Sequence, residues 1–346
     1  MSSLRECYND LTKDTNRWSY YNNAPSLTVD IMKSNNMSFT FIKDYFKCGG
    51  KEEVFQPLQI KSNETELEER APHIISTYLL GILIADSLGI DLQTRDSKNI
   101  NFKYLWFLAC LYHDIGYVYE NIHNCKYLRM IQADGLDAIR EVCDIKYLHE
   151  REFITYKREH VNTYLTNRAA CTHGKVGKID HGIAGGLMLY DQLRKNYERV
   201  WKKVSRYNAN VSRKYFEYKG LYFSNSHYEY YAEAADAIIA HNIWLSTLNK
   251  YLKNEKKTKL REQIINKSNP TAFILSLADS LEPIKRGKFE ILDRISFEQI
   301  RNGFAFSMPI FIYENIYGKI SDLKTWVAID IIEEKGQGRF SIVTKE

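Results

Sequence analysis

The chain has 346 residues, of which 44% are hydrophobic and 26% charged, and its formal net charge is +5. A chain of this length can bury a substantial core, and the composition is ordinary for a globular protein. The mild positive charge suits phosphorylated ligands but falls short of the clustered basic footprint of a dedicated nucleic-acid binder. We therefore expect a small-molecule partner and no nucleic acid.

The cysteines and the N-terminal segment bear on location. None of the six cysteines forms a CxxC pair, so the sequence indicates neither a zinc knuckle nor a redox couple. The polar start, MSSLRECYNDLTKDTNR, has no apolar signal core. The longest apolar stretches, such as 79–85 and 105–112, are too short and too interrupted to span a bilayer. We expect no membrane partner and a location in the reducing cytoplasm.

The first elements are expected to be helical. Residues 1–69 predict an N-terminal extension of short helical pieces, with a turn at KCGGKE. The polar segment SNETELEER leads to Pro72, and we expect the following apolar helix to begin there, with proline in its first turn. Apolar residues recur at helical spacing from 73 to 88, and Gly89 is a plausible C-cap. The apolar run 102–113 predicts a helix buried on all sides.

Further helices are predicted over 183–204, 228–248 and 270–284. The basic, tyrosine-rich stretch 194–226 is interpreted either as a solvated helical hairpin or as a cap over a binding site. As a cap, it would supply cations and aromatic rings to a phosphorylated ligand. The body of the protein, residues 70–287, is therefore expected to be a helical bundle.

The C-terminal region differs from the rest of the chain in its residue pattern, which is partly that of strands. FEILDRISF and NGFAFSM have the pattern of strands, GKISDLKTWV has that of a helix, and AIDIIEE and GRFSIVT flank the turn KGQG as a hairpin. These segments predict a small α+β appendage over residues 288–346. This appendage is a candidate for homo-dimerisation or partner binding. The expected fold class is thus mainly α, with a small C-terminal α+β region.

Histidine and aspartate recur within the apolar helices, in the segments APHIISTYLLG, CLYHDIGYVYE, IDHGIAGGLML, AIIAHNIWL and LSLADSLEP. A bare imidazole or carboxylate is costly in such a setting unless it has a partner. Several such groups that converge on one point form a metal centre, because a divalent cation compensates them all. Only a folded helical bundle can assemble segments so far apart in the chain. The residues are His73, His113, Asp114, His181, His241 and Asp279.

In that order the segments resemble the HD superfamily of metal-dependent phosphohydrolases, in the six-ligand form that holds two metals. The resemblance covers roughly residues 70–290 and implies an HD-domain helical bundle. It implies that one metal is held by His73, His113 and Asp279. It implies that a second metal is held by His181 and His241, and that the carboxylate of Asp114 bridges the two.

The ligand set also bears on the metal and the reaction. Mixed imidazole and carboxylate ligation suits iron or manganese and is compatible with magnesium, cobalt, nickel or zinc. Two adjacent divalent metals can lower the pKa of a bridging water and polarise phosphoryl oxygens. The resemblance therefore implies a phosphohydrolase or phosphodiesterase that hydrolyses a nucleotide or related phosphoester through a metal-bridging hydroxide.

Two other functions stay open. One branch of the same superfamily uses six such ligands to hold a mixed-valent diiron centre that activates oxygen, and the ligands alone do not separate it from the hydrolases. The other alternative is a regulatory module that senses a nucleotide without turning it over. The chain departs from cyclic-dinucleotide phosphodiesterases of the GYP subclass, because Tyr117 follows HDIG where these proteins carry lysine, and no GYP motif occurs.

Residues beside the expected ligands are candidates for catalysis. Arg70 lies one helical turn before His73 and either grips a phosphate or pairs with Glu68 or Glu69. Asp180 directly precedes a ligand histidine and is placed to orient its imidazole. Together with the bridging Asp114, these two residues are the candidate catalytic residues.

Basic residues on the approach to the site are candidates for substrate binding, in addition to Arg70. They are Lys175 and Lys178, in HGKVGKID, and Arg286, with its neighbour Lys285 a weaker candidate. The remaining histidines lie in no such context and are expected to be packing residues. They are His123, His149, His160, His173 and His227.

Overall fold

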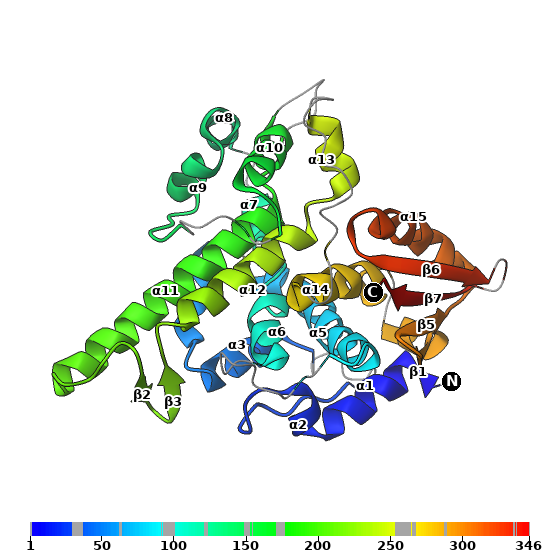
Figure 1. The fold of residues 1–346 in the computed structure, drawn as a ribbon, viewed down its shortest axis with the longest axis horizontal. Helices are drawn as coiled ribbons and strands as arrows, with labels where there is room; N and C mark the ends of the chain where they lie inside the picture. The colour runs from blue at the N-terminus through cyan, green and yellow to red at the C-terminus, as the bar shows by residue number, and fades with distance from the viewer. Residues whose placement is uncertain are drawn as a thin grey trace.

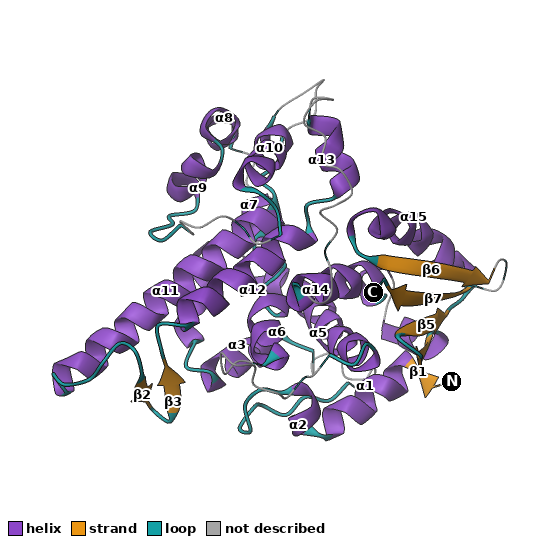
Figure 2. Ribbon diagram, viewed as in Figure 1, coloured by secondary structure: helices purple, strands orange, loops and turns teal. Residues whose placement is uncertain are grey.

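The protein is mainly α-helical, with a small antiparallel sheet near its C-terminal end, in agreement with the predicted fold class. In the computed structural model the helices form one body and the sheet lies at its side, next to both chain termini (Figures 1 and 2). No helix among the described residues is both long and apolar enough to cross a membrane. The structure describes residues 2–29, 37–61, 64–90, 92, 101–120, 124–148, 153, 155–170, 177–252, 264, 268–286, 289–334, 336 and 338–345.

The elements before the longest helix are α1 (Leu4–Lys13), α2 (Thr15–Trp18), α3 (Phe39–Cys48), η2 (Glu52–Val54), α4 (Gln56–Lys61), α5 (Glu64–Ser87), α6 (Phe102–Cys110), α7 (Tyr117–Glu120), α8 (Cys125–Asp134), α9 (Leu136–Val142) and α10 (Arg158–Ala169). The later helices are α11 (His181–Tyr207), α12 (His227–His241), α13 (Leu245–Tyr251), α14 (Pro270–Leu281), η5 (Ile284–Arg286), η6 (Phe289–Arg294) and α15 (Ile310–Trp326). The strands are β1 (Ser2–Ser3), β2 (Phe216–Tyr218), β3 (Leu221–Phe223), β4 (Ser296–Ile300), β5 (Gly303–Ser307), β6 (Ile329–Glu334) and β7 (Arg339–Thr344).

Helix α5 begins at Glu64, so the predicted start at Pro72 is wrong and the proline lies inside the helix. Proline removes one backbone donor and destabilises a helix interior. Leu67 and Ala71 are nevertheless buried before the proline, as Ile74 is after it. Burial of this continuous apolar face offsets the local cost. The predicted domain boundary after residue 69 therefore falls within a single helix.

Helix α6 is buried along its whole length, as predicted, and it ends at Cys110. The turn 111–116 follows and carries His113 and Asp114. Trp106 of α6 packs closely on Gly81 of α5 and donates a hydrogen bond to the carbonyl oxygen of Tyr78 at 3.0 Å. This packing fixes α6, and the turn that follows it, against α5.

Glycines let α11 approach its neighbours closely. A Cβ on Gly186 would lie 2.5 Å from the carbonyl oxygen of Ala235 in α12. A Cβ on Gly116, in the HDIG turn, would lie 1.9 Å from the carbonyl oxygen of His181 at the start of α11. Such separations are shorter than van der Waals contact, so a larger residue at either position requires a backbone shift. The close approach brings HDIG, DHG and the end of α12 together.

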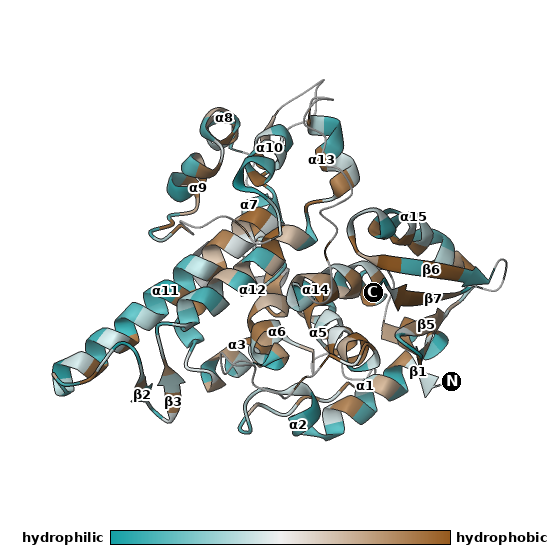
Figure 3. Cartoon of the chain, viewed as in Figure 1, coloured by the Kyte–Doolittle hydropathy of each residue, from teal (hydrophilic) through white to brown (hydrophobic). Residues whose placement is uncertain are grey.

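The stretch 194–226 does not form a helical hairpin. Helix α11 continues to Tyr207, and β2 and β3 then pair as a small antiparallel hairpin. Phe216 and Phe223 stack on one face of this hairpin, with ring centroids 5.2 Å apart, and Phe216 also contacts Tyr197 of α11. Helix α11 becomes hydrophilic toward its outer end, beside the hairpin (Figure 3). The burial of these aromatic rings explains why strands form where a second helix was expected.

The larger sheet has the strand order β1-β4-β5-β7-β6, and every neighbouring pair is antiparallel. Strand β1 pairs with β4, so the N-terminus becomes part of the C-terminal sheet. The predicted strand FEILDRISF is correct only from Ser296, because η6 precedes it. The adjacent residues Ile291 and Leu292 are both buried, whereas a half-buried strand alternates buried and exposed residues.

The close packing of α11 on α12 can be tested with Gly186→Ala. The added methyl group overlaps the Ala235 carbonyl, so we expect a loss of about 1–3 kcal/mol in the free energy of unfolding, measured by chemical denaturation. The matched control is Gly318→Ala in α15, where a Cβ meets nothing within 4 Å. That variant is expected to gain up to about 1 kcal/mol from helix propensity. Equal stability of the two variants would contradict this packing.

Candidate metal centre

Five elements bring the predicted ligands together. His73 projects from the middle of α5, and His113 and Asp114 from the turn after α6. The first residue of α11, His181, and the last residue of α12, His241, face the same point as Asp279 of α14. Nε2 of His73 lies 3.1 Å from Oδ1 of Asp279 and 3.5 Å from Oδ2 of Asp114.

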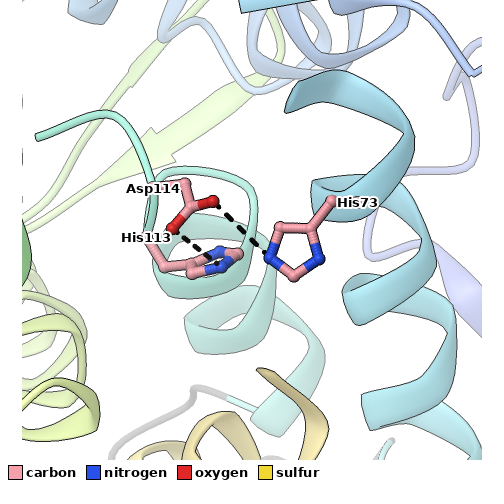
Figure 4. A group of neighbouring side chains, drawn as sticks. All are labelled: His73, His113 and Asp114. Atoms are coloured by element: carbon pink, nitrogen blue, oxygen red, sulfur yellow. Dashed lines mark ion pairs between the residues drawn. The ribbon is translucent and has the colours of Figure 1, made fainter. Parts of the chain in front are cut away.

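These residues form two buried groups with one shared member. His73, His113 and Asp114 offer ligand atoms that all lie within 4.8 Å of one another (Figure 4). The second group, which meets the same limit, consists of Asp114, His181 and His241. Oδ1 of Asp279 lies 3.5 Å from Nε2 of His113, next to the first group. The described residues thus contain buried histidine and aspartate groups that could hold a metal ion.

Unsatisfied polar atoms at the centre fit a cation. Nε2 of His73, His113 and His241 is buried without a hydrogen-bond partner among the described residues. Both carboxylate oxygens of Asp114 are in the same condition. Buried polar groups are almost always satisfied, and leaving several unpaired at one point costs several kcal/mol. A divalent cation accepts lone pairs from all of these atoms at once.

The other ring nitrogen, Nδ1, of each of these histidines has a hydrogen-bond partner. Nδ1 of His73 lies 2.7 Å from Oε2 of Glu282, and Nδ1 of His181 lies 2.6 Å from Oε2 of Glu120. Nδ1 of His113 and of His241 contacts the carbonyl oxygens of Cys110 and Ile238. Carboxylates and carbonyls only accept hydrogen bonds, so each Nδ1 donates. In its neutral form each imidazole therefore carries its lone pair on Nε2, the usual arrangement of metal-bound histidine.

The ionisable groups of the site shift one another's pKa values. Burial by itself lowers the pKa of His73, but the neighbouring carboxylates of Asp279 and Glu282 together outweigh burial and the pKa rises to about 9. Burial raises the pKa of Asp114, yet the neighbouring His113 and other cations hold it well below its usual range. Burial, followed by the repulsion of His113, lowers the pKa of His241 to about 3. An ionised Asp114 and a neutral His241 are the protonation states that ligate metals, and a cation would displace the proton of His73.

Cations flank the partly exposed side of the centre. The guanidinium carbon of Arg70 lies 3.5 Å from the ring centroid of Tyr117, and one of its nitrogens lies 3.5 Å from Oδ2 of Asp114. Tyr117 in turn stacks on His181 at 3.8 Å. Nζ of Lys285 lies 3.2 Å from Oδ1 of Asp279. Of the two partners expected for Arg70, Glu68 instead accepts a hydrogen bond from the backbone of Phe39.

Asp180 has a different contact from the one expected. Its Oδ1 caps α11 by accepting from the backbone nitrogen of Ile183, and its Oδ2 accepts from the side-chain amide of Asn242 at 2.7 Å. Glu120, and not Asp180, contacts Nδ1 of His181. An N-cap must turn back toward the backbone of its own helix, so its carboxylate cannot also reach the next imidazole. Asp180 therefore fixes the start of α11 and its junction with the end of α12.

The substrate-binding candidates fall into two groups. Nζ of Lys178 lies 3.3 Å from Oε1 of Glu120, so this lysine pairs with the carboxylate that holds His181. Lys175 and the side chain of Arg286 lie outside the described residues. The same holds for His123, His149 and His173, while His160 and His227 belong to neither metal-ligand group.

Sequence reasoning missed Glu120 and Glu282. Both are buried, and each holds one ligand imidazole. The signal was present, because Glu120 is the last residue of the segment CLYHDIGYVYE and Glu282 the second-last residue of LSLADSLEP. An acidic residue next to an apolar run that carries a metal ligand is a candidate hydrogen-bond partner for that ligand.

Comparison with known proteins yields no match, whether with family models, curated proteins or solved structures. The resemblance to the HD superfamily therefore rests on the ordered motifs. The geometry independently establishes a mainly helical protein with buried histidine and aspartate groups that could bind metal.

The shared position of Asp114 leads to a prediction about metal content. If each group holds a metal, Asp114→Ala is expected to lose both, because the residue belongs to both groups, whereas His241→Ala is expected to lose one preferentially. Metal-to-protein ratios after loading with iron or manganese and gel filtration measure this. His227→Ala, at the other end of α12, is the control and should keep the wild-type ratio. Two metals retained by both Asp114→Ala and His241→Ala would show that the ligands are misassigned.

The contact of Glu120 with His181 leads to a second prediction. Glu120→Gln keeps the shape of the side chain but removes the charge that favours an Nδ1-protonated imidazole. Affinity for a metal bound at the group that contains His181 is expected to fall about 10- to 100-fold, as measured by titration against a competing chelator. Glu217→Gln, an exposed change in β2, should leave the affinity unaltered. An unchanged affinity in Glu120→Gln would mean that this contact does not support a ligand.

Proposed function

We propose that this chain is a phosphohydrolase of the HD type that holds two divalent cations and hydrolyses a nucleotide or a related phosphoester. The observation that carries the proposal is the membership of Asp114 in both buried ligand groups. A carboxylate can offer one oxygen to each of two cations, which an imidazole with its other nitrogen engaged cannot do. Two adjacent cations are a recurring arrangement in phosphoester hydrolysis.

Iron or manganese fits the donor set best, because imidazole nitrogen predominates over carboxylate oxygen. His73, His113 and Asp279 would hold one cation, and His181 and His241 the other. When bound, such cations lower the pKa of a water and stabilise the charge that develops on phosphoryl oxygens. No separate protein nucleophile is then required.

The flanking cations favour an anionic substrate. Arg70 and Lys285 lie beside Asp114 and Asp279, and both side chains are partly exposed. Proximity to two carboxylates outweighs burial and raises the pKa of Lys285, so its ammonium stays charged at neutral pH. Guanidinium and ammonium groups bind phosphate oxygens by charge-assisted hydrogen bonds. Tyr117 orients Arg70 through the contact of its ring with the guanidinium.

Residues behind the ligands would maintain this geometry during turnover. Glu120 and Glu282 accept hydrogen bonds from two imidazoles and fix their tautomers. Asp180 links the start of α11 to Asn242 just after α12. Ligand positions that are fixed before the substrate binds lower the reorganisation needed in the transition state.

A panel of nucleotides and cyclic dinucleotides tests the activity directly. We expect the iron- or manganese-loaded protein to release a hydrolysis product without oxygen, detected by mass spectrometry, and a chelator or Asp114→Ala to abolish release. Products that appear only with oxygen and carry an added oxygen atom would instead establish a diiron oxygenase. Nucleotide binding at the metal centre without any product would establish a sensing module.

Arg70→Ala tests the phosphate contact once a hydrolysed substrate is in hand. Loss of a hydrogen bond to a charged group costs about 1.5–3 kcal/mol, which corresponds to a fall in kcat/KM of roughly 10- to 100-fold. Metal content is expected to stay at two per chain. Arg206→Ala, at the exposed outer end of α11, should keep the wild-type value. An equal kcat/KM in the two variants would remove Arg70 from substrate binding.

A further inference from the structure

A cavity lies away from the candidate metal centre. It has a volume of about 1200 Å³ and is bounded by the N-terminal segment, the start of α6, the β2–β3 hairpin and the start of α12. Ligand sites commonly have volumes of about 300–1,000 Å³, so a drug-sized or nucleotide-sized molecule fits. None of the metal-ligand candidates lines the cavity.

The lining of this cavity is both basic and aromatic. Its described residues include no aspartate or glutamate. The cationic members are Lys51, Lys103 and Lys214. The tyrosines are Tyr20, Tyr21, Tyr104, Tyr215, Tyr222 and Tyr230. Such a surface fits a ligand that joins an anionic group to a flat ring.

Lys51 is the most informative lining residue, because its side chain is buried, with 2% exposure. Its Nζ donates to the carbonyl oxygen of Gly49 at 3.1 Å, and it forms no ion pair with a carboxylate of the described residues. The ring of Phe223 lies 4.9 Å away. Burial lowers the pKa of Lys51 to about 7. A buried cation without an anion is costly, and an anionic ligand would compensate it.

His227 adds a neutral donor beside Lys51. Its Nδ1 lies 3.0 Å from the backbone nitrogen of Ser224 and 3.2 Å from the carbonyl oxygen of the same residue. When Nδ1 accepts from the backbone nitrogen, the ring proton lies on Nε2. Burial, and then the repulsion of Lys51, lowers the pKa of His227 to about 3. The imidazole is therefore neutral at physiological pH, and in the tautomer with the proton on Nε2 it can donate to a phosphate oxygen without adding charge.

Exposed tyrosines provide the aromatic part. Tyr215 and Tyr222, on the β2–β3 hairpin, are 61% and 60% exposed, and their rings stack with centroids 5.5 Å apart. Large aromatic rings usually bury much of their surface, so an exposed pair at the edge of a cavity suits contact with another ring. Stacking of a base on such a side chain contributes about 1–3 kcal/mol.

We propose that this cavity is a second binding site and that its ligand is a nucleoside phosphate. The phosphate lies against Lys51 and His227, and the base lies against the tyrosines of the hairpin. An anion would favour the charged form of Lys51, which has no carboxylate partner among the described residues, and the exposed rings favour a planar group attached to that anion. The site is separate from the proposed reaction at the metal centre and does not depend on it.

Two helices connect the cavity to the metal centre. Helix α12 carries His227 at its first residue and His241 at its last, about 20 Å away at 1.5 Å per residue. Helix α6 starts beside the cavity, at Lys103 and Tyr104, and leads into the turn that carries Asp114. A nucleotide in the cavity therefore contacts the helices that position the metal ligands, without itself reaching the metals.

The test is calorimetric titration of the full chain, freed of metal with EDTA, with ATP, GTP, CTP, UTP and inorganic phosphate. We expect at least one triphosphate to bind with a Kd below about 1 mM. Lys51→Met keeps an apolar stem without the charge and should weaken binding by at least about tenfold. Tyr222→Ala, at an exposed position that does not endanger folding, should weaken it by at least about fivefold. The matched controls are Lys203→Met and Tyr207→Ala, at exposed positions outside the lining, which should bind as wild type.

Three results would overturn the proposal. The first is that no nucleotide binds in EDTA. The second is that binding survives in both Lys51→Met and Tyr222→Ala. The third is that binding requires added metal and disappears in Asp114→Ala, which would place the nucleotide at the metal centre. Because EDTA removes any activity of that centre, binding in the cavity and hydrolysis can each fail without the other.

Discussion

The burial of one carboxylate among four imidazoles is the constraint on which the centre of this protein depends. Asp114 is 1% exposed, and neither of its oxygens has a hydrogen-bond partner among the described residues. A charge in this condition costs several kcal/mol unless another charge compensates it. Arg70, at 3.5 Å, and the neighbouring His113 and Lys285 supply part of that compensation. The elements that converge here therefore place a buried negative charge where a bound metal ion would stabilise it.

Local features of the chain explain how such a costly arrangement is assembled. The HDIG turn contacts the start of α11 only because Gly116 has no side chain, and α11 contacts α12 through Gly186. The carboxylates behind the ligands, Glu120 and Glu282, then orient two of the imidazoles. Close backbone packing sets the distances between helices, and hydrogen bonds set the directions of the rings. Both are needed, because lone pairs must point to one place as well as lie near it.

The sequence predicted what depends on composition and periodicity. The spacing of apolar residues located the buried helices. The histidines and aspartates within these helices or at their ends were predicted to converge, and the structure brings them together. It failed where tertiary contacts override local preference. Pro72 lies within α5 because one apolar face continues through it, and the β2–β3 hairpin forms because Phe216 and Phe223 bury their rings against α11. The role of Asp180 depended on the direction of one side chain, which spacing in the chain does not determine.

A short segment of the chain connects the C-terminal sheet to the candidate metal centre. Strand β1 pairs with β4, and α14, which carries Asp279, leads through η5 and η6 into β4. Lys285 and Glu282 lie in this short connection, one contacting Asp279 and the other His73. A shift of the sheet relative to α14 would therefore move groups that contact the ligands. The appendage is thus placed to influence the centre through this connection, although none of its strands supplies a ligand.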